Sequence, residues 1–273
     1  MNTNSNTYTV VYSAIIVIVV AAILAFAAMS LNDRQVANMK AETIGQILTA
    51  AKIPSGESNA EIIATYKDQI AEAYTVDLKG AKVNELPAED ATIYTTSDLK
   101  AQNYNIADGA SAELPVYVFK NGTKVVPIYG AGLWGPVWGY VAITPDGKIA
   151  GATFDHASET PGLGGKIKDD PSFAAQFDGK AFDFSDAAPF AIVKGGAPAG
   201  KANAIDAITG ATMTSKGLDV AINNWVKAYA PVLAGASSDC CKGEGKCCGC
   251  CAEGGCCQEG NCCMDSEETN TEE

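Results

Sequence analysis

The segment Asp206–Ser215, DAITGATMTS, brings hydroxyl side chains and small residues together where a helical pattern begins. The helix is expected to start near Thr212–Ser215, because residues on or near one apolar face follow from there: Met213, Val220, Ala221 and Trp225. A helix N-terminus offers unpaired N–H donors and the positive end of the helix dipole, which together bind phosphate. A single Ser or Thr acting as N-cap is the simpler explanation of the hydroxyls. The residues alone leave both explanations open.

Two further segments have a composition that suits a binding site. Gly130–Ile143, GAGLWGPVWGYVAI, sets two tryptophans and a tyrosine among glycines, which is typical either of a buried core or of a wall for a flat ring. Phe154–Ile167, FDHASETPGLGGKI, carries a predicted strand into a glycine-rich turn. It contains His156, the single histidine of the chain, near Glu159. With only one histidine available, general acid–base catalysis by this pair is disfavoured.

The charge of the chain limits its partners. The 273 residues carry a formal net charge of −13, which argues against nucleic acid, since phosphate backbones bind basic surfaces. From Ser237 onward nine acids stand against two lysines, so seven of the thirteen excess charges lie in the C-terminal tail. All ten cysteines lie there too. The body up to Gly235 therefore has no disulfide, no thiolate metal site and no cysteine nucleophile.

Residues Val10–Leu31, VVYSAIIVIVVAAILAFAAMSL, form an uncharged apolar run of 22 residues. As a helix it is long enough to cross the hydrocarbon core of a bilayer, which is about 30 Å thick. A cleaved signal peptide is the alternative, because Ala25–Ala27 resembles a cleavage site. An uncleaved anchor is favoured, since the first nine residues lack Lys and Arg and the run is longer than a signal peptide needs. Arg34 and Lys40 follow the run and favour a cytoplasmic body, but the neighbouring acids weaken this charge rule.

The periodicity of the body changes from helical to strand-like. Met39–Ile53 and Asn59–Val76 have the spacing of amphipathic helices, separated by a turn. From Leu114 onward, apolar segments alternate with turn signals, and hairpin turns are expected at Asn121–Gly122 and Asp146–Gly147. The remaining expected elements are a short helix near Pro171–Phe177, a strand at Pro189–Gly195, a loop at Gly195–Gly200 and the closing helix. Hairpins followed by helices predict an α+β fold with a mainly antiparallel sheet.

Three motifs, taken together, resemble one family of flavoproteins. Asp206–Thr212, DAITGAT, is similar to the motif in which a flavin transferase esterifies FMN phosphate onto the last threonine. Glu159–Gly165, ETPGLGG, and Gly130–Tyr140, GAGLWGPVWGY, resemble flavin-domain segments of the C subunit of the Na+-translocating NADH:quinone reductase. The threonine motif alone occurs in several flavoproteins, but the three motifs in this order identify the family. The resemblance covers roughly Leu114–Ala230, and the single N-terminal anchor matches as well.

The resemblance implies one FMN per chain, attached through its phosphate to Thr212. Residues near this threonine would be recognised during attachment or would bind the phosphate: Asp206, Thr209, Gly210, Ala211, Thr214 and Ser215. Residues of the other two motifs would line the flavin ring or hold its polar edge: Leu133, Trp134, Glu159, Thr160, Gly162, Leu163 and Gly164. No catalytic side chain is expected, because the cofactor performs the redox chemistry.

The implied function is that of an anchored electron carrier, which relays electrons from NADH toward quinone while the complex exports Na+. The implied partners are the other members of a six-subunit complex, the B subunit in particular, a flavin transferase during maturation, and membrane lipid. The family also implies that the flavin domain lies on the periplasmic side of the bacterial inner membrane, against the charge rule. Two alternatives remain: the G subunit of the Rnf ferredoxin:NAD reductase, and a non-redox anchored metal-binding protein that uses the cysteine tail.

The expected organisation has five parts: an N-terminal segment (1–9), a transmembrane helix (10–31), a helical connecting region of the extracytoplasmic domain (32–110), the FMN-binding domain (111–234) and an acidic, cysteine-rich tail (235–273). The tail departs from the family pattern. Its five Cys-Cys pairs, separated by small and charged residues, cannot form a core and predict disorder. Zinc-ligand spacing makes a metal site there a further hypothesis, with disulfide scrambling or low-complexity drift as alternatives: Cys247, Cys248, Cys250 and Cys251.

Overall fold

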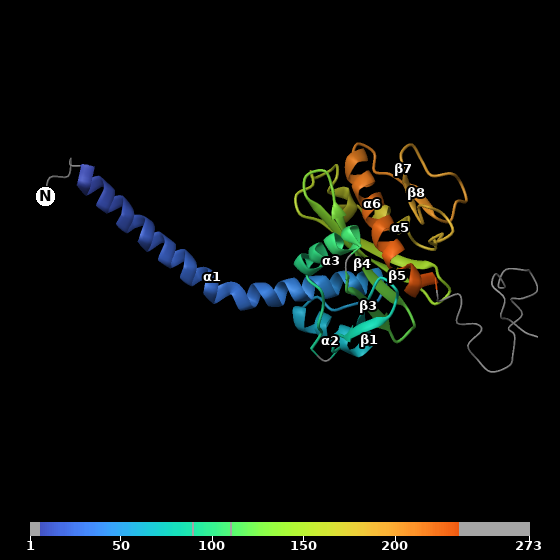
Figure 1. Cartoon of the computed structure of the whole chain (residues 1–273). Helices are drawn as coiled ribbons and strands as arrows, with labels where there is room; N and C mark the ends of the chain where they lie inside the picture. Colours follow the sequence, from blue (N-terminus) through green and yellow to red (C-terminus); the bar gives the residue numbers. More distant parts are fainter. Residues whose placement is uncertain (1–5, 89, 110, 235–273) are drawn as a thin grey trace, which may run out of the picture.

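The computed structural model describes residues 6–88, 90–109 and 111–234. A long helix leads into an α+β domain built around an antiparallel sheet (Figure 1). This architecture confirms the predicted fold class. The predictions for the cysteine tail, including its disorder and its metal site, lie outside the described residues.

Helix α1 (Asn6–Ala50) joins two elements that were expected to be separate, the anchor at Val10–Leu31 and the helix at Met39–Ile53. Residues 32–38 contain neither Gly nor Pro, so nothing in the sequence stops the helix between them. The apolar N-terminal part of α1 is long and hydrophobic enough to cross a membrane, and it is entirely exposed. The C-terminal part enters the core of the domain, where its three large apolar side chains Ile44, Ile47 and Leu48 are fully buried.

The main sheet has six strands in the order β2-β1-β3-β4-β5-β6, and each neighbouring pair is antiparallel. The strands are β1 (Ile70–Val76), β2 (Lys82–Glu85), β3 (Leu114–Phe119), β4 (Lys124–Ala131), β5 (Pro136–Ile143) and β6 (Ile149–His156). Both predicted hairpin turns are confirmed, because Gly122 and Gly147 sit between paired strands with φ of +80° and +79°. Glycine adopts these left-handed angles without steric cost.

The prediction of a helix at Asn59–Val76 is confirmed in its first part and wrong from Ile70 onward. Helix α2 (Asn59–Gln69) begins with the capping box of Ser58 and Glu61, but the chain becomes strand β1 at Ile70. The spacing of Ile62, Tyr66 and Ile70 fits a helix, yet β1 instead pairs with β3 along its whole length. Pairing in the sheet buries most of β1 and therefore overrides the local helical pattern. The sheet also crosses the predicted division between residues 110 and 111.

Helices cover both faces of the sheet (Figure 1). Helix α3 (Thr96–Asp108) and helix α6 (Thr212–Ala228) pack on the face to which Val126 and Val141 contribute. The end of α1 and α2 pack on the opposite face, where Val125 and Tyr140 are buried. The remaining elements are α4 (Lys166–Asp169), α5 (Pro171–Ala175), α7 (Ala230–Leu233) and a parallel pair formed by β7 (Ala191–Val193) and β8 (Ala204–Asp206).

Helix α6 lies very close to strand β4. A Cβ atom added to Gly217 would overlap the carbonyl group of Ala131, and one added to Gly130 would overlap the side chain of Ala221. These small residues therefore set the distance between the helix and the sheet. The expected apolar face of α6 needs correction, because Met213 and Val220 are exposed. At about 100° per residue, both lie on the side of the helix opposite the buried Trp225.

Candidate functional site

The three sequence motifs meet in space at the start of α6. The first is the turn between β4 and β5, the second is the loop 157–165 that follows β6, and the third is the first turn of α6 itself. The carboxylate of Glu159 connects them. Its Oε1 accepts a hydrogen bond from the backbone N–H of Trp134 at 2.8 Å, and its Oε2 accepts one from the Thr214 hydroxyl at 2.7 Å.

Glu159 is buried, with 4 % of its surface exposed, and its charge is satisfied by hydrogen bonds. Burial alone would raise the pKa of Glu159. The hydroxyl of Thr214 and the N–H groups of Trp134 and Leu133 outweigh this effect and lower the pKa below its ordinary value. The side chain is therefore an ionised carboxylate at neutral pH, and it acts as a clamp between two loops and a helix.

Two glycines make room for this clamp. A Cβ atom at Gly164 would collide with Glu159 Oε2 and with the Thr214 hydroxyl. A Cβ atom at Gly132 would collide with Glu159 Oε1. Both collisions involve the oxygens that make the clamp, so any larger residue at either position would displace the carboxylate.

Helix α6 begins without a side-chain cap among the described residues. Its N-cap is Ala211, whose methyl group cannot accept a hydrogen bond. Helices α2 and α3 differ, because each starts with a complete capping box. The Ser or Thr N-cap that the sequence left open is therefore absent from α6, and Thr212 is its exposed first residue. The N–H groups of this first turn are available for an anion.

An exposed apolar rim surrounds the start of α6. Its members are Leu133 (49 % exposed), Trp134 (66 %), Leu163 (45 %) and Met213 (57 %). They come from all three motifs, and Gly210, whose φ is +84°, lies so close to Leu163 that an added Cβ atom would stand 3.1 Å from its Cδ2. Of the three aromatic residues expected to form a wall, only Trp134 is exposed. Tyr140 is buried on the α1 face and Trp138 packs partly into the core.

Several other predicted residues have structural contacts of their own. The Asp206 carboxylate accepts the N–H of Ala197, and the Ser215 hydroxyl accepts the N–H of Ile208. Thr160 accepts N–H groups through its carbonyl, Gly162 has a positive φ in the same loop, and Thr209 is exposed. The structure brings the following predicted residues to the Glu159 clamp and the apolar rim: Leu133, Trp134, Glu159, Leu163, Gly164, Gly210 and Thr214.

Three residues of the site were not predicted as part of it. Met213 was expected to be buried, Gly132 gives space to Glu159, and the Ser158 hydroxyl donates to the Trp134 carbonyl at 3.1 Å. A helical-wheel count from Trp225 could have identified Met213 as exposed. Nothing in the sequence marks Gly132 or Ser158, because their roles depend on which loops meet.

These residues fit a flavin mononucleotide. The first turn of α6 supplies unpaired N–H donors for a phosphate, and the apolar rim supplies surface for a ring. Among residues 6–88, 90–109 and 111–234, no group of three or more His, Cys, Asp or Glu side chains could hold a metal ion.

Comparisons with known proteins agree with this assignment. Residues 132–227 match the sequence model of the FMN-binding domain family. The C subunit of the Na(+)-translocating NADH-quinone reductase of Vibrio anguillarum is 33 % identical, over 78 % of this chain and 88 % of that protein. The corresponding protein of Pasteurella multocida is also 33 % identical, over 78 % and 87 %.

Two solved structures have a similar fold. The C subunit of the same reductase from Parabacteroides distasonis is 33 % identical, has a TM-score of 0.63 and is matched over 96 % of its chain and 74 % of this one. NqrC of Shewanella oneidensis is 26 % identical, has a TM-score of 0.61 and is matched over 99 % of its chain and 74 % of this one. The names of these relatives favour the reductase over the Rnf alternative. The chain thus belongs to the NqrC family, the C subunits of the Na+-translocating NADH-quinone reductases, and its exposed apolar helix associates it with a membrane.

Proposed function

We propose that this chain carries one FMN as a phosphodiester on Thr212 and relays electrons from NADH toward quinone within a Na+-exporting reductase. The observation that carries the proposal is the start of α6. An exposed threonine is the first residue of a helix without a side-chain cap among the described residues, and exposed apolar residues of all three motifs lie near that helix start. No such combination occurs at the capped starts of α2 and α3 within the described chain.

Each part of the site has a role in this proposal. In the attached form the Thr212 oxygen is the ester oxygen, and the N–H groups of Met213 and Thr214 stabilise the charge that the phosphodiester keeps, since the Ser215 N–H already donates to the Ala211 carbonyl. The helix dipole contributes about 0.3–1 kcal/mol to this stabilisation. The rim residues contact the flavin ring, while Glu159 holds the loops that present them. When bound, FMN supplies the electron-transfer chemistry, and the exposure of the rim residues leaves it accessible to a neighbouring carrier.

The proposal includes the surroundings of the chain. Helix α1 anchors the domain at the bacterial inner membrane, and the flavin domain lies on the periplasmic side. A flavin transferase attaches the cofactor there, and the B subunit of the reductase is the partner that receives electrons. The support for these points is the family relationship together with the exposed apolar part of α1. A reporter enzyme that is active only in the periplasm, fused after Ala234, should be active.

The first experiment is co-expression of the full chain with a flavin transferase, followed by a denaturing gel under ultraviolet light and peptide mass spectrometry. Fluorescence should survive denaturation and map to the Thr212 peptide. It should disappear in Thr212→Ala, because the ester oxygen is lost. Thr96→Ala is the matched control, since Thr96 is also an exposed first residue of a helix. That control should fluoresce like the wild type.

A non-fluorescent wild-type band, with a transferase shown to modify another substrate, would reject covalent attachment. Attention would then move to the metal-binding alternative. Two variants separate the proposals: the metal-binding alternative expects function to be lost on deletion of the tail from residue 235 and kept in Thr212→Ala, whereas the flavin proposal expects the reverse.

A further inference from the structure

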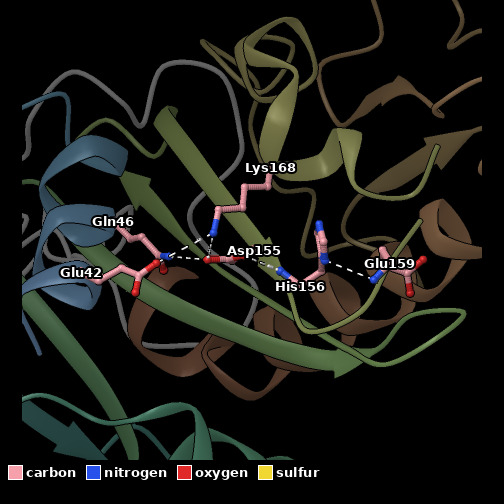
Figure 2. A network of polar contacts seen from close by, with 6 residues as sticks. All are labelled: Glu42, Gln46, Asp155, His156, Glu159 and Lys168. Atoms are coloured by element: carbon pink, nitrogen blue, oxygen red, sulfur yellow. Dashed lines mark hydrogen bonds and ion pairs between the residues drawn. The ribbon is translucent and has the colours of Figure 1, made fainter. Parts of the chain in front are cut away.

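Two consecutive residues at the end of β6 face in opposite directions. Figure 2 shows Asp155 turned toward Gln46 and Lys168, while His156 is turned toward Glu159. Successive side chains of a strand alternate between its two sides, so this divergence follows from the strand itself. One side of this pair leads to α1 and the other to the proposed flavin site.

Asp155 joins three elements. Its Oδ2 accepts hydrogen bonds from Gln46 Nε2 of α1 and from Lys168 Nζ of α4, both at 2.8 Å, and its Oδ1 accepts the N–H of His156 at 2.8 Å. Only 4 % of Asp155 is exposed. Buried charges need such partners, and loss of one partner leaves the other charge unsatisfied. On the same side of β6, the Thr153 hydroxyl donates to the carbonyl of Gln46 at 3.1 Å.

The ring of His156 holds the backbone of Glu159. Its Nδ1 accepts the N–H of Glu159 at 3.2 Å, which requires that this nitrogen carry no proton. The carboxylate of the same residue forms the clamp with Trp134 and Thr214. A hydrogen-bonded path therefore runs from α1 to the first turn of α6 through Gln46, Asp155, His156, Glu159 and Thr214.

A cavity lies next to this path, and both Gln46 and Asp155 line it. It has a volume of about 540 Å³ and lies between α1, the segment 92–97 and β5, with Asp155 in its wall. Val36 and Met39 of α1 line it and are exposed. On its cavity side α1 borders open space, while Ile44, Ile47 and Leu48 pack in the core on its other side, so Gln46 supplies a fixed polar contact where α1 lacks packed neighbours.

We propose that His156 is a positioning residue for Glu159 and that, with Asp155, it couples the orientation of the membrane helix to the shape of the flavin site. The proposal rests on the proposed function for the identity of that site. The coupling itself is a property of the protein alone. It is therefore testable in a chain that carries no flavin.

The test is hydrogen exchange of the full chain in detergent, prepared without a flavin transferase and read by mass spectrometry. The readout is the exchange of peptides that contain Trp134 and Glu159. His156→Ala should speed this exchange, because the Glu159 N–H loses its acceptor. His156→Asn should stay near the wild type, since the amide oxygen of asparagine can replace Nδ1 as acceptor. If His156 only filled space, His156→Asn would not restore slow exchange relative to His156→Ala.

A second variant tests the coupling from the membrane side. Gln46→Ala should also speed exchange at Trp134 and Glu159, although Gln46 contacts neither. The control on the same helix is Thr49→Ala, because the Thr49 hydroxyl bonds only the Gly45 carbonyl within α1. In a double-mutant cycle, Gln46→Ala should add little once His156 is alanine.

The outcomes separate the two proposals. Unchanged exchange in Gln46→Ala, or equal exchange in His156→Ala and His156→Asn, would overturn the coupling. Faster exchange as described, together with wild-type protein that accepts no flavin from an active transferase, would keep the coupling and reject the proposed function. Thermal unfolding of each variant identifies any that fails to fold, and Gln46→Ala then decides in place of a misfolded His156→Ala.

Discussion

At the scale of single residues, the site depends on one buried carboxylate. Taking a carboxylate out of water is unfavourable unless hydrogen bonds replace those of the solvent. Glu159 accepts them from Thr214 and from the backbone beside Trp134, so its charge stabilises the contact between α6 and the loops. The same residue would be unfavourable at this position if either loop were displaced.

Glu159→Gln should destabilise the domain at neutral pH. The amide keeps the size of the side chain but loses the charge. Its NH₂ group, which is itself a donor, would face either the Trp134 N–H or the Thr214 hydroxyl. Hydrogen bonds to charged groups contribute about 1.5–3 kcal/mol, so a loss of roughly this size is expected in the free energy of unfolding. Denaturant titration of the purified chain measures it. Glu57→Gln, at an exposed loop position, should change little.

The same prediction fixes how the stability difference between the wild type and Glu159→Gln changes with pH. The pKa of Glu159 is lowered in the folded chain, so its stabilising contribution is present above the ordinary value of 4.5 and is lost as the pH falls through the lowered pKa. The stability difference between the wild type and Glu159→Gln should therefore shrink as the pH falls below 4.5. A difference that grows in acid would contradict the ionised clamp.

Gly164→Ala and Gly45→Ala should have opposite effects. The new methyl group at Gly164 meets two oxygens of the clamp and should destabilise by about 1–3 kcal/mol, as overpacking does. The methyl group at Gly45 has only an ordinary contact, 4.0 Å from Ile62, and alanine there should stabilise α1 by about 0.5–1 kcal/mol. Thermal unfolding of both variants, side by side, checks the contrast.

At the scale of elements, the sequence predicted features that have local causes. Glycine turns predicted the hairpins at Gly122 and Gly147, and the helical pattern predicted the start of α6 at Thr212. Strand β1 was missed, because its conformation depends on pairing with β3, a strand that is distant along the chain. The roles of Gly132 and Ser158 were missed for the same reason, since each depends on a loop from another motif.

The close packing of α6 on β4 leads to a prediction for flavin attachment. Gly217→Ala places a methyl group against the Ala131 carbonyl, so the helix must move away from the sheet. The shift separates Thr212 from the rim residues of the β4–β5 turn. Fluorescent labelling by the transferase should fall, and stability should drop by about 1–3 kcal/mol. Unchanged labelling in a folded variant would show that attachment needs only the first turn of α6.

At the scale of the whole molecule, α1 belongs both to the membrane and to the core. A chain that begins at residue 32 keeps Ile44, Ile47 and Leu48 and should fold as a water-soluble domain. A chain that begins at residue 52 loses all three, at about 1.5–3 kcal/mol each, which is comparable to the whole stability of a typical domain. It should aggregate or remain unfolded. Circular dichroism and gel filtration of the two chains measure the difference.

The continuity of α1 also sets the orientation of the domain about the axis of that helix. Because one helix of 45 residues runs from the apolar segment into the core, its register fixes which way Thr212 faces. One alanine inserted after Arg34 would swing the domain by about 100° and raise it by about 1.5 Å. Four alanines would raise it by about 6 Å yet return it to within about 40° of its original bearing. The two insertions therefore test separately whether electron exchange with a neighbouring carrier depends on the axial position of the domain or on the direction in which Thr212 faces.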